Sequence, residues 1–288
     1  MTAPLRFGFS LSQHYLDWPA LRRQAELAEA CGVDYLWVFD HFVSMRDGID
    51  GPTLEGWMLL AAFAPLTRTV RLGTLVSGNT YRHPSLLAKQ VVSLDHISGG
   101  RAVLGLGAGW HAAEHRMYGF PFPPAGERVE RFGEALALID ALMRQERTTY
   151  HGRYYQLEEA PFQPKPLQRP RVPFLLGAQG SRMLRLVARH ADIWDADAAP
   201  MDPAESPVPA KVAELDGYCR AIGRDPATLR RSIWSRTALR SEAEVRRFVA
   251  AWRAHGFTDF FFKLPDPLDP DAVHRLATTV FPALKAGG

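Results

Sequence analysis

Short apolar segments alternate with longer amphipathic segments along the whole chain, and this alternation limits the folds open to it more than any other feature. The short segments predict eight strands, at residues 5–11, 34–39, 70–76, 101–108, 172–176, 192–194, 228–234 and 257–264. Helical spacing lies between them, most clearly over 126–146, where apolar residues recur at intervals of three and four. Because a parallel return needs a long crossover, strands that alternate with helices predict a parallel sheet.

Eight strand–helix units in a chain of 288 residues give roughly 36 residues per unit, which is the usual scale of a (β/α)8 barrel. We therefore predict an α/β fold, a (β/α)8 TIM barrel that forms one domain over residues 1–288, with insertions after the fourth strand. Within the insertions, residues 148–157 predict a β-hairpin that turns at His151 and Gly152. A doubly wound open sheet is the alternative fold.

Charge, cysteine content and hydropathy narrow the classes of partner. The net charge is only +3 and no long basic run is present, which argues against a nucleic-acid footprint. Cys31 and Cys219 are far apart in the chain, which argues against a disulfide framework and favours a reducing cytoplasm. The N-terminal segment lacks the pattern of a signal peptide, and no apolar run reaches the length of about 18 residues that suggests a membrane span. We expect a soluble cytoplasmic protein.

Asp40 and His41 directly follow the second predicted strand. The carboxyl ends of barrel strands carry the chemistry of this fold, and a histidine there titrates near neutral pH and can exchange protons. The alternative is an aspartate that caps the next segment beside a histidine with a structural hydrogen bond.

Two glycine-rich segments also end predicted strands. The first, GLGAG at 105–109, does not match the dinucleotide fingerprint, because its spacing is wrong and Trp110 follows Gly109. Its glycines would let the backbone approach a planar ligand closely. The second, GAQGS at 177–181, precedes a helix expected to begin near Ser181, where free N–H groups can bind an anion. A plain strand–helix turn is the alternative there.

The segment HAAEH at 111–115 formally matches a zinc signature in which Glu114 would act as a base. It is short, it follows a glycine-rich strand end, and residues 118–124 interrupt any helix there. We therefore expect no metal site.

Taken together, these motifs resemble the luciferase-like monooxygenase superfamily, and most closely its branch dependent on coenzyme F420, a deazaflavin. The resemblance is collinear and covers nearly the whole chain. It rests on VFDHF, LGTLVSGNTYRHPSLLAKQVVSLDHISGGR, VLGLGAGWHAAEHRMYGFPFPP, GRYYQLEEAPFQPKP, LLGAQGSRMLRLVARHADIW and GFTDFFFKL.

The resemblance implies a TIM barrel, commonly a homodimer, that holds the deazaflavin at the strand ends and transfers a hydride between it and an organic substrate. His41 would be the catalytic residue, and a non-prolyl cis peptide is expected at Leu75–Val76. The residues implied to bind the cofactor are Asp40, Leu75, Val76, Gly107, Ala108, Gly109, Gly177, Ala178, Gln179, Gly180 and Ser181. Ser10 and Trp110 are expected in the substrate pocket.

Trp110 departs from the members that oxidise a sugar phosphate, which carry a glutamate at this position. Tryptophan offers a stacking surface and one N–H donor but cannot exchange a catalytic proton. The departure favours an apolar or aromatic substrate over a sugar phosphate. Two alternatives remain, an FMN-dependent monooxygenase of the same superfamily and a flavin-binding protein without turnover.

Overall fold

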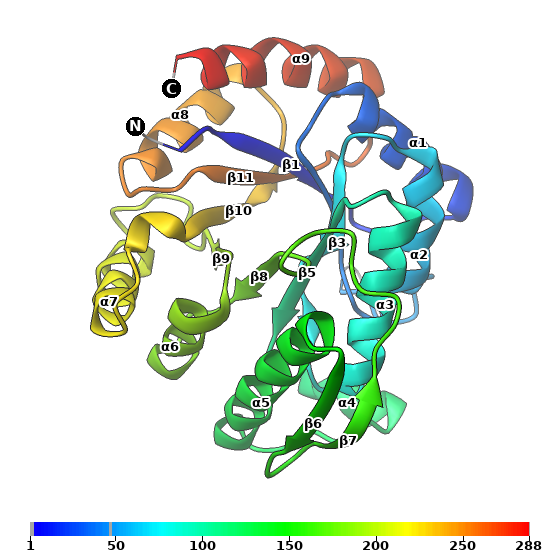
Figure 1. The fold of residues 1–288 in the computed structure, drawn as a ribbon. Coiled ribbons are helices and arrows are strands. Elements are labelled where there is room, and N and C mark those ends of the chain that lie inside the picture. The colour runs from blue at the N-terminus through cyan, green and yellow to red at the C-terminus, as the bar shows by residue number, and fades with distance from the viewer. Residues whose placement is uncertain (1–2, 46–47, 288) are drawn as a thin grey trace.

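The computed structural model describes residues 3–45 and 48–287, which form a closed barrel of parallel strands with helices around it (Figure 1). Within these residues, eight strands pair in the order β3-β2-β1-β11-β10-β9-β8-β5, and pairing of β3 with β5 closes the barrel. Their bounds are β1 (Arg6–Ser10), β2 (Tyr35–Val38), β3 (Arg71–Thr74), β5 (Ala102–Gly107), β8 (Phe174–Gly177), β9 (Ile193–Asp197), β10 (Arg230–Ala238) and β11 (Asp259–Lys263). The predicted TIM barrel is confirmed.

Helices cover the outer face of the barrel (Figure 1). They are α1 (Trp18–Ala30), α2 (Gly56–Phe63), α3 (Pro84–Ile97), α5 (Ala125–Arg144), α6 (Ser181–His190), α7 (Val208–Ala221), α8 (Glu242–Arg253) and α9 (Pro270–Ala286), with short 3-10 turns η1 (Ala64–Leu66) and η2 (Pro226–Thr228). The boundaries follow local signals. Asp17 caps α1 by accepting a hydrogen bond from the Ala20 N–H, and Gly32 leaves the helix with a φ of +63°.

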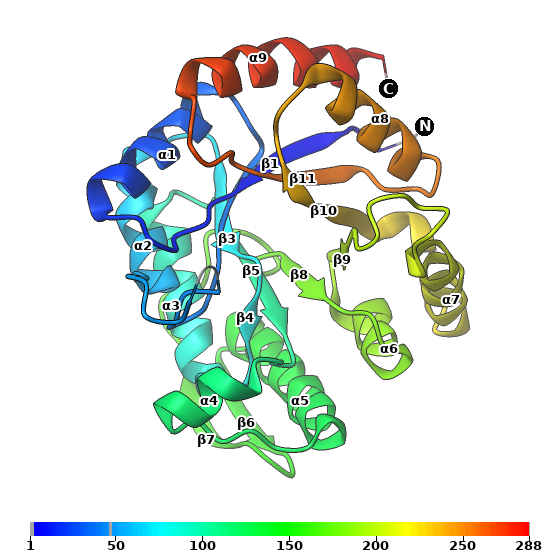
Figure 2. The ribbon, with the colours of Figure 1, turned by 180° about the vertical axis from the view of Figure 1, so that it is seen from behind.

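The insertion lies between the fourth and fifth barrel strands, as predicted. It contains α4 (Ala112–Tyr118), α5 and a hairpin of β6 (Arg147–His151) and β7 (Gln156–Pro161), which lie together in Figure 1. His151 pairs with Gln156, so the hairpin turns over residues 152–155 and not at His151 and Gly152 as predicted. A two-residue strand, β4 (Ser77–Gly78), extends the sheet beside β5 and is seen from behind in Figure 2.

Large side chains fill the inside of the barrel. The inner cluster consists of Tyr35, Trp37, Leu75, Val103, Leu175, Ile193 and Phe261. At the N-terminal end of the strands, buried Asp259 accepts hydrogen bonds from Arg230 and from the Tyr35 hydroxyl, the latter at 3.1 Å. Arg6 in turn donates to the Tyr35 oxygen at 2.8 Å. An ion pair between Arg230 and Asp259, extended through the Tyr35 hydroxyl to Arg6, therefore fills this end of the barrel.

The state of the cysteines and the character of the helices bear on the chain's environment. Cys31 and Cys219 are both free and buried. Among the described helices, none combines the length and the apolar character needed to cross a bilayer.

Candidate active site

The C-terminal ends of the barrel strands form a mouth whose inward-facing side chains follow from strand alternation. Tyr35 and Phe261 point into the barrel, and a Cβ atom on Gly8 would lie 2.8 Å from the Tyr35 Cβ, so Gly8 faces inward as well. Ser10, two residues further on and in register with Trp37, faces the same lumen. By the same alternation, the residues that face inward at the mouth include Ser10, Gly107, Gly177, Asp197 and Lys263.

Two of these residues, Gly107 and Gly177, lie beside Val76 and together form a surface that we call the glycine wall. A Cβ atom would lie 3.1 Å from Val76 Cγ2 if placed on Gly107, and 3.3 Å if placed on Gly177. Deeper in the barrel, a Cβ atom on Gly105 would lie 1.7 Å from the Thr74 carbonyl oxygen, so only glycine allows β3 and β5 to approach this closely. The two glycine motifs therefore come together on one side of the mouth.

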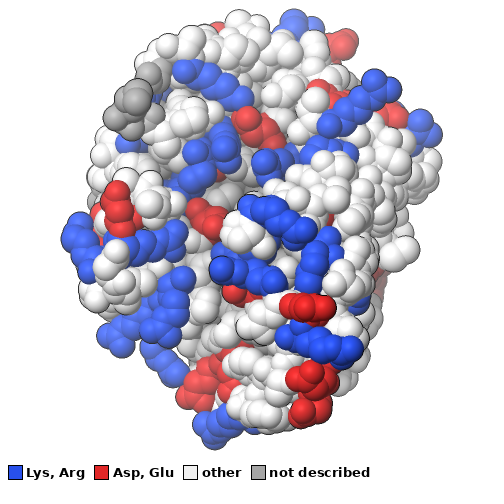
Figure 3. Space-filling model, viewed as in Figure 1, with Lys and Arg blue, Asp and Glu red and all other residues white. Residues whose placement is uncertain are grey.

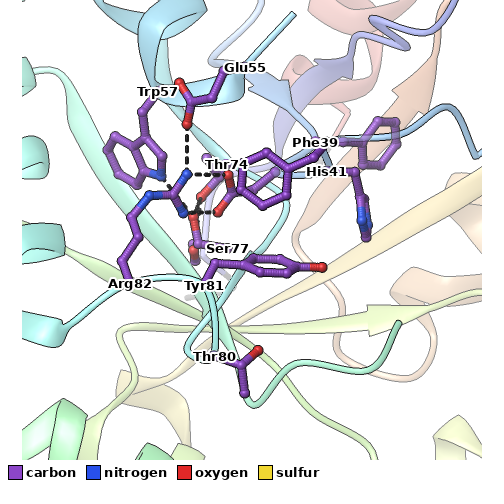
Figure 4. A network of polar contacts seen from close by, with 12 residues as sticks. Phe39, His41, Glu55, Trp57, Thr74, Ser77, Thr80, Tyr81 and Arg82 are labelled. Carbon is purple, nitrogen blue, oxygen red and sulfur yellow. Dashed lines mark hydrogen bonds and ion pairs between the residues drawn. The ribbon is translucent and has the colours of Figure 1, made fainter. Parts of the chain in front are cut away.

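The segment that carries Val76 is held at both ends. The Leu75–Val76 peptide bond is cis, as predicted. On one side, the Thr74 hydroxyl donates to the Gly105 carbonyl at 2.9 Å. On the other, Ser77 Oγ accepts from Trp57 Nε1 at 3.0 Å and shares a hydrogen bond with Thr74, and these side chains lie beside one another in Figure 4.

Asp40 is buried, and its carboxylate forms an ion pair with Arg82. Arg82 Nη1 lies 2.5 Å from Asp40 Oδ2 and Arg82 Nη2 lies 2.8 Å from Asp40 Oδ1, which is a bidentate pair. The same guanidinium also donates to Glu55 Oε1 at 2.6 Å, and Figure 4 shows Arg82 pointing toward Glu55. An ion pair thus links the end of β2 to the segment after β4.

His41 contacts Glu114 across the mouth. Its Nδ1 atom lies 2.8 Å from Glu114 Oε2, and its side chain is 11% exposed whereas that of Glu114 is fully buried. Burial alone would raise the pKa of Glu114, but hydrogen bonds from His41 and Tyr81 outweigh it and lower the pKa to about 2. Burial and the Glu114 carboxylate together raise the pKa of Tyr81, so this phenol stays a hydrogen-bond donor.

Trp110 and the histidines of 111–115 surround this pair. Trp110 is 65% exposed, and its ring centroid lies 5.7 Å from that of His41 in an edge-to-face arrangement. His111 caps α4 by accepting from the Glu114 N–H at 2.9 Å, and His115 Nε2 lies 2.6 Å from Thr80 Oγ1. His111, Glu114 and His115 thus have separate partners. The described ranges contain no cluster of three or more His, Cys, Asp or Glu arranged to hold a metal.

The loop at 177–181 leads into α6 as expected. Gly180 is the N-cap residue and has no side chain that could accept from the first N–H groups of the helix. Ser181 is the first helical residue. Ala178 is buried, whereas Gln179, Gly180 and Ser181 are exposed. The first N–H groups of α6 are thus accessible at the rim of the mouth.

Asp195 faces the lumen beside Gly177 and was not identified from the sequence. Its Oδ1 atom accepts a hydrogen bond from Ser232 Oγ at 2.7 Å. Burial, together with the nearby charges of Asp197 and Asp259, raises the pKa of Asp195 to about 8. A carboxyl group with this pKa can lose or gain a proton near neutral pH inside the barrel.

Asp195→Asn is expected to make the free energy of unfolding of the cofactor-free protein less dependent on pH. Because the pKa of Asp195 is higher in the folded than in the unfolded chain, its contribution to stability is complete below about pH 4 and is lost as the pH rises through about 8. The variant should therefore gain stability over the wild type between pH 4 and pH 9, as measured by urea unfolding. Glu158→Gln, at a side chain that is 77% exposed, is the control, and a difference that does not vary with pH would contradict the assignment.

Glu114 and Arg82 were also missed as members of the site. The sequence offered a partial signal for each, since a buried aspartate at a strand end needs a cationic partner and the HAAEH segment contains an acid between two histidines. Neither signal identifies the partner, because the pairs are 42 and 73 positions apart in the chain.

Comparisons with known proteins identify the family of the chain. Residues 3–277 match the family model described as luciferase-like monooxygenase. An F420-dependent glucose-6-phosphate dehydrogenase of Microbacterium testaceum is 37% identical over 194 residues, which cover 67% of this chain but 56% of that relative. An F420-dependent hydroxymycolic acid dehydrogenase of Mycobacterium tuberculosis is 29% identical over 263 residues, covering 91% of this chain and 70% of the relative.

A solved structure shows the same fold. The coenzyme F420-dependent tetrahydromethanopterin reductase of Methanopyrus kandleri superposes with a TM-score of 0.83 at 18% identity, covering 98% of this chain and 99% of that one. The family model spans nearly all of the chain and the barrel agrees with it. The chain therefore belongs to the luciferase-like monooxygenase family.

Proposed function

We propose that this protein is a coenzyme F420-dependent oxidoreductase that moves a hydride between the deazaflavin and an organic substrate. The observation that carries the proposal is the meeting, at one barrel mouth, of a glycine wall around Val76 with the His41–Glu114 pair. Two relatives named as F420-dependent dehydrogenases support the choice of cofactor. When bound, the deazaflavin supplies the hydride chemistry, and the protein supplies position and proton transfer.

The residues at the mouth fit a flat ring with polar edges. Gly107 and Gly177 let Val76 lie close against the backbone of β5 and β8, since a side chain on either would meet Val76, and the resulting surface without projecting side chains suits a planar group. Within the described residues, the buried Ser10 Oγ, Trp37 Nε1 and Trp234 Nε1 atoms lack a hydrogen-bond partner. Buried donors normally find a partner, so these atoms suit a ligand with acceptors that reaches into the mouth.

The ring and the anionic end of the cofactor would use different parts of the rim. Leu75, Val76, Gly107, Ala108 and Gly109 would flank the ring. Gly177, Ala178, Gln179, Gly180 and Ser181 would hold a phosphate at the start of α6, where N–H groups are accessible. Asp40 is retained as a proposed cofactor-binding residue, with its carboxylate oriented by Arg82.

The substrate would enter beside Trp110 and His41. Trp110 presents an exposed indole next to the imidazole, which suits an apolar or aromatic group, and Ser10 adds a hydroxyl deeper in the mouth. Because Trp110 cannot exchange a proton as a carboxylate can, we propose a substrate other than a sugar phosphate, although one relative is named for glucose 6-phosphate.

We also propose that the chain is one functional domain that acts in the cytoplasm as a homodimer on small molecules. Met58 on α2 and Leu86 on α3 are 71% and 53% exposed on adjacent helices, which favours a partner surface there. Figure 3 shows basic side chains across the centre and left of one face with acidic side chains among them. This interleaving, with a net charge of +3, does not favour nucleic acid.

The cofactor-free protein is expected to bind coenzyme F420 at least tenfold more tightly than FMN, a difference of about 1.4 kcal/mol. Both ligands carry a tricyclic ring and a phosphate, but the VFDHF segment resembles the deazaflavin branch, and a mildly basic protein suits an acidic oligoglutamate tail. Fluorescence titration with each cofactor measures the ratio. Tighter binding of FMN would place the protein in the monooxygenase branch and refute the proposed function.

A matched pair of glycine variants tests the location of the site. Gly107→Ala places a methyl group 3.1 Å from Val76 Cγ2 at the mouth and should weaken binding of the deazaflavin. Gly217→Ala places one on α7 where nothing lies within 4 Å, and should leave affinity unchanged. Equal affinities for the two variants would move the ring away from the glycine wall.

A further inference from the structure

Glu114 is the centre of a four-contact hydrogen-bond cluster at the mouth. Its Oε1 atom accepts from the backbone N–H groups of Phe42 and Val43, at 2.6 and 3.1 Å. Its Oε2 atom accepts from the Tyr81 hydroxyl and lies 2.8 Å from His41 Nδ1. Each carboxylate oxygen therefore has two partners, and the side chain is fully buried.

This cluster determines which nitrogen of His41 carries a proton. An ionised carboxylate can only accept hydrogen bonds, and the pKa of Glu114, lowered to about 2, keeps it ionised at neutral pH. The contact at 2.8 Å therefore requires a proton on Nδ1. Among the described residues, no group bonds to the Nε2 atom, so this nitrogen is the one left available to a substrate.

We propose that Glu114 is a positioning residue that holds His41 in the Nδ1–H tautomer and presents Nε2 to the reacting substrate. The inference deepens the proposed function and rests on it for the identity of the reaction. The Phe42 and Val43 amides, in turn, fix Glu114 to the segment that carries His41, so the two side chains cannot separate without breaking backbone hydrogen bonds.

The proton balance is simple. When a group of the substrate loses a proton, His41 Nε2 takes it and the ring becomes an imidazolium, while the Nδ1–H bond to Glu114 stays intact. In the reverse direction, Nε2 returns that proton and the ring becomes neutral again. The carboxylate of Glu114 remains ionised throughout and stabilises the positive ring, as in other carboxylate–histidine pairs.

Other titratable groups face this pair from three elements. The His111 ring lies 5.9 Å from that of His41, and the His115 ring stacks on Tyr81 at 4.7 Å. The Asp40–Arg82 ion pair joins the residue before His41 to the residue after Tyr81. None of these groups contacts Nδ1 of His41, which leaves Glu114 as the group that determines the tautomer.

The first test is spectroscopic and uses the cofactor-free protein. Nitrogen-15 NMR of labelled histidine rings, with His41→Ala to assign the signal, should show a proton on Nδ1 of the His41 ring. In Glu114→Gln the amide nitrogen can donate to Nδ1, so the proton should move to Nε2. Tyr81→Phe removes another bond to the same oxygen and should leave the Nδ1–H form. A wild-type ring that carries a proton on Nε2 but none on Nδ1 would overturn the proposal, even if Glu114→Gln failed to fold.

The second test is kinetic and separates this role from a structural one. Glu114→Gln should lower kcat by about 10–100-fold, the usual effect of losing the partner that orients a functional histidine, with cofactor affinity retained. Added to His41→Ala, the same substitution should have no further effect. An equal additional loss in that background would show that Glu114 acts independently of His41. The NMR result does not depend on the cofactor, so failure of the positioning role and failure of F420 binding are distinguishable.

Discussion

His41→Ala is expected to lower the turnover of the F420-loaded enzyme by about 10²–10⁴-fold, the range typical of a lost general acid or base. The imidazole is 11% exposed, and its free nitrogen faces the mouth because Glu114 holds the other one. The glycine wall that would contact the ring lies on β5 and β8, not on the segment with His41. Affinity for the deazaflavin should therefore change little, as fluorescence titration can measure.

The comparison that interprets this result is His111→Ala. His111 lies next to His41 in the mouth, but its Nδ1 atom caps α4. His111→Ala should therefore lower the stability of this short helix and should change kcat less than His41→Ala does. Unchanged turnover in His41→Ala would leave His41 as a structural hydrogen-bonding residue. A loss confined to cofactor affinity would move its role from proton transfer to binding.

Arg82→Ala is expected to lower the free energy of unfolding by about 3–5 kcal/mol, the usual cost of leaving a buried charge without its partner. Asp40 is 1% exposed and both of its carboxylate oxygens are bonded to Arg82. Glu55 also loses a contact, but its side chain is 31% exposed and water can replace the arginine there. Urea unfolding of the cofactor-free protein at neutral pH gives the value.

A double-mutant cycle tells the charge effect from simple loss of packing. Asp40→Asn alone should cost less than Arg82→Ala, since Arg82 keeps Glu55. Combined with Arg82→Ala, Asp40→Asn should restore part of the lost stability, because the uncompensated carboxylate is gone. The surface pair of Arg246 and Glu242, whose side chains are 43% and 53% exposed, serves as control, and Arg246→Ala should change stability by less than about 0.5 kcal/mol. Additive effects at Asp40 and Arg82 would show that the pair contributes no specific coupling.

Local patterns were enough to predict the barrel. Each predicted strand contains apolar residues that the lumen or the surrounding helices bury, and strand geometry places Phe261 of FTDFFFKL inside and Phe260 and Phe262 outside. The strand predicted at 192–194 continues to Asp197, because Asp195 and Asp197 face the lumen and interrupt the apolar run that marks a strand. Polar residues inside a barrel mouth are therefore where the hydropathy pattern underestimates strand length.

The partners of the site residues could not be predicted in the same way. His41 and Asp40 were found because they end a strand, but Glu114 lies on α4 within an insertion whose placement depends on the barrel being closed. The HAAEH segment indicated an acid near two histidines, and the structure pairs that acid with a third histidine from another segment. Contacts of this kind depend on tertiary packing, which no local periodicity describes.

The Arg230–Asp259 ion pair and the hydrogen bonds through Tyr35 to Arg6, with the aromatic layer above them, fill the N-terminal end of the described barrel. In the proposed reaction, substrate and product would therefore share the entrance at the C-terminal ends of the strands, and a bound cofactor would narrow it on the side of Gly107 and Gly177. A second substrate molecule would then enter only after the product has left. Departure of the product past Trp110 would set the rate of the whole cycle wherever it is slower than transfer of the hydride and the proton.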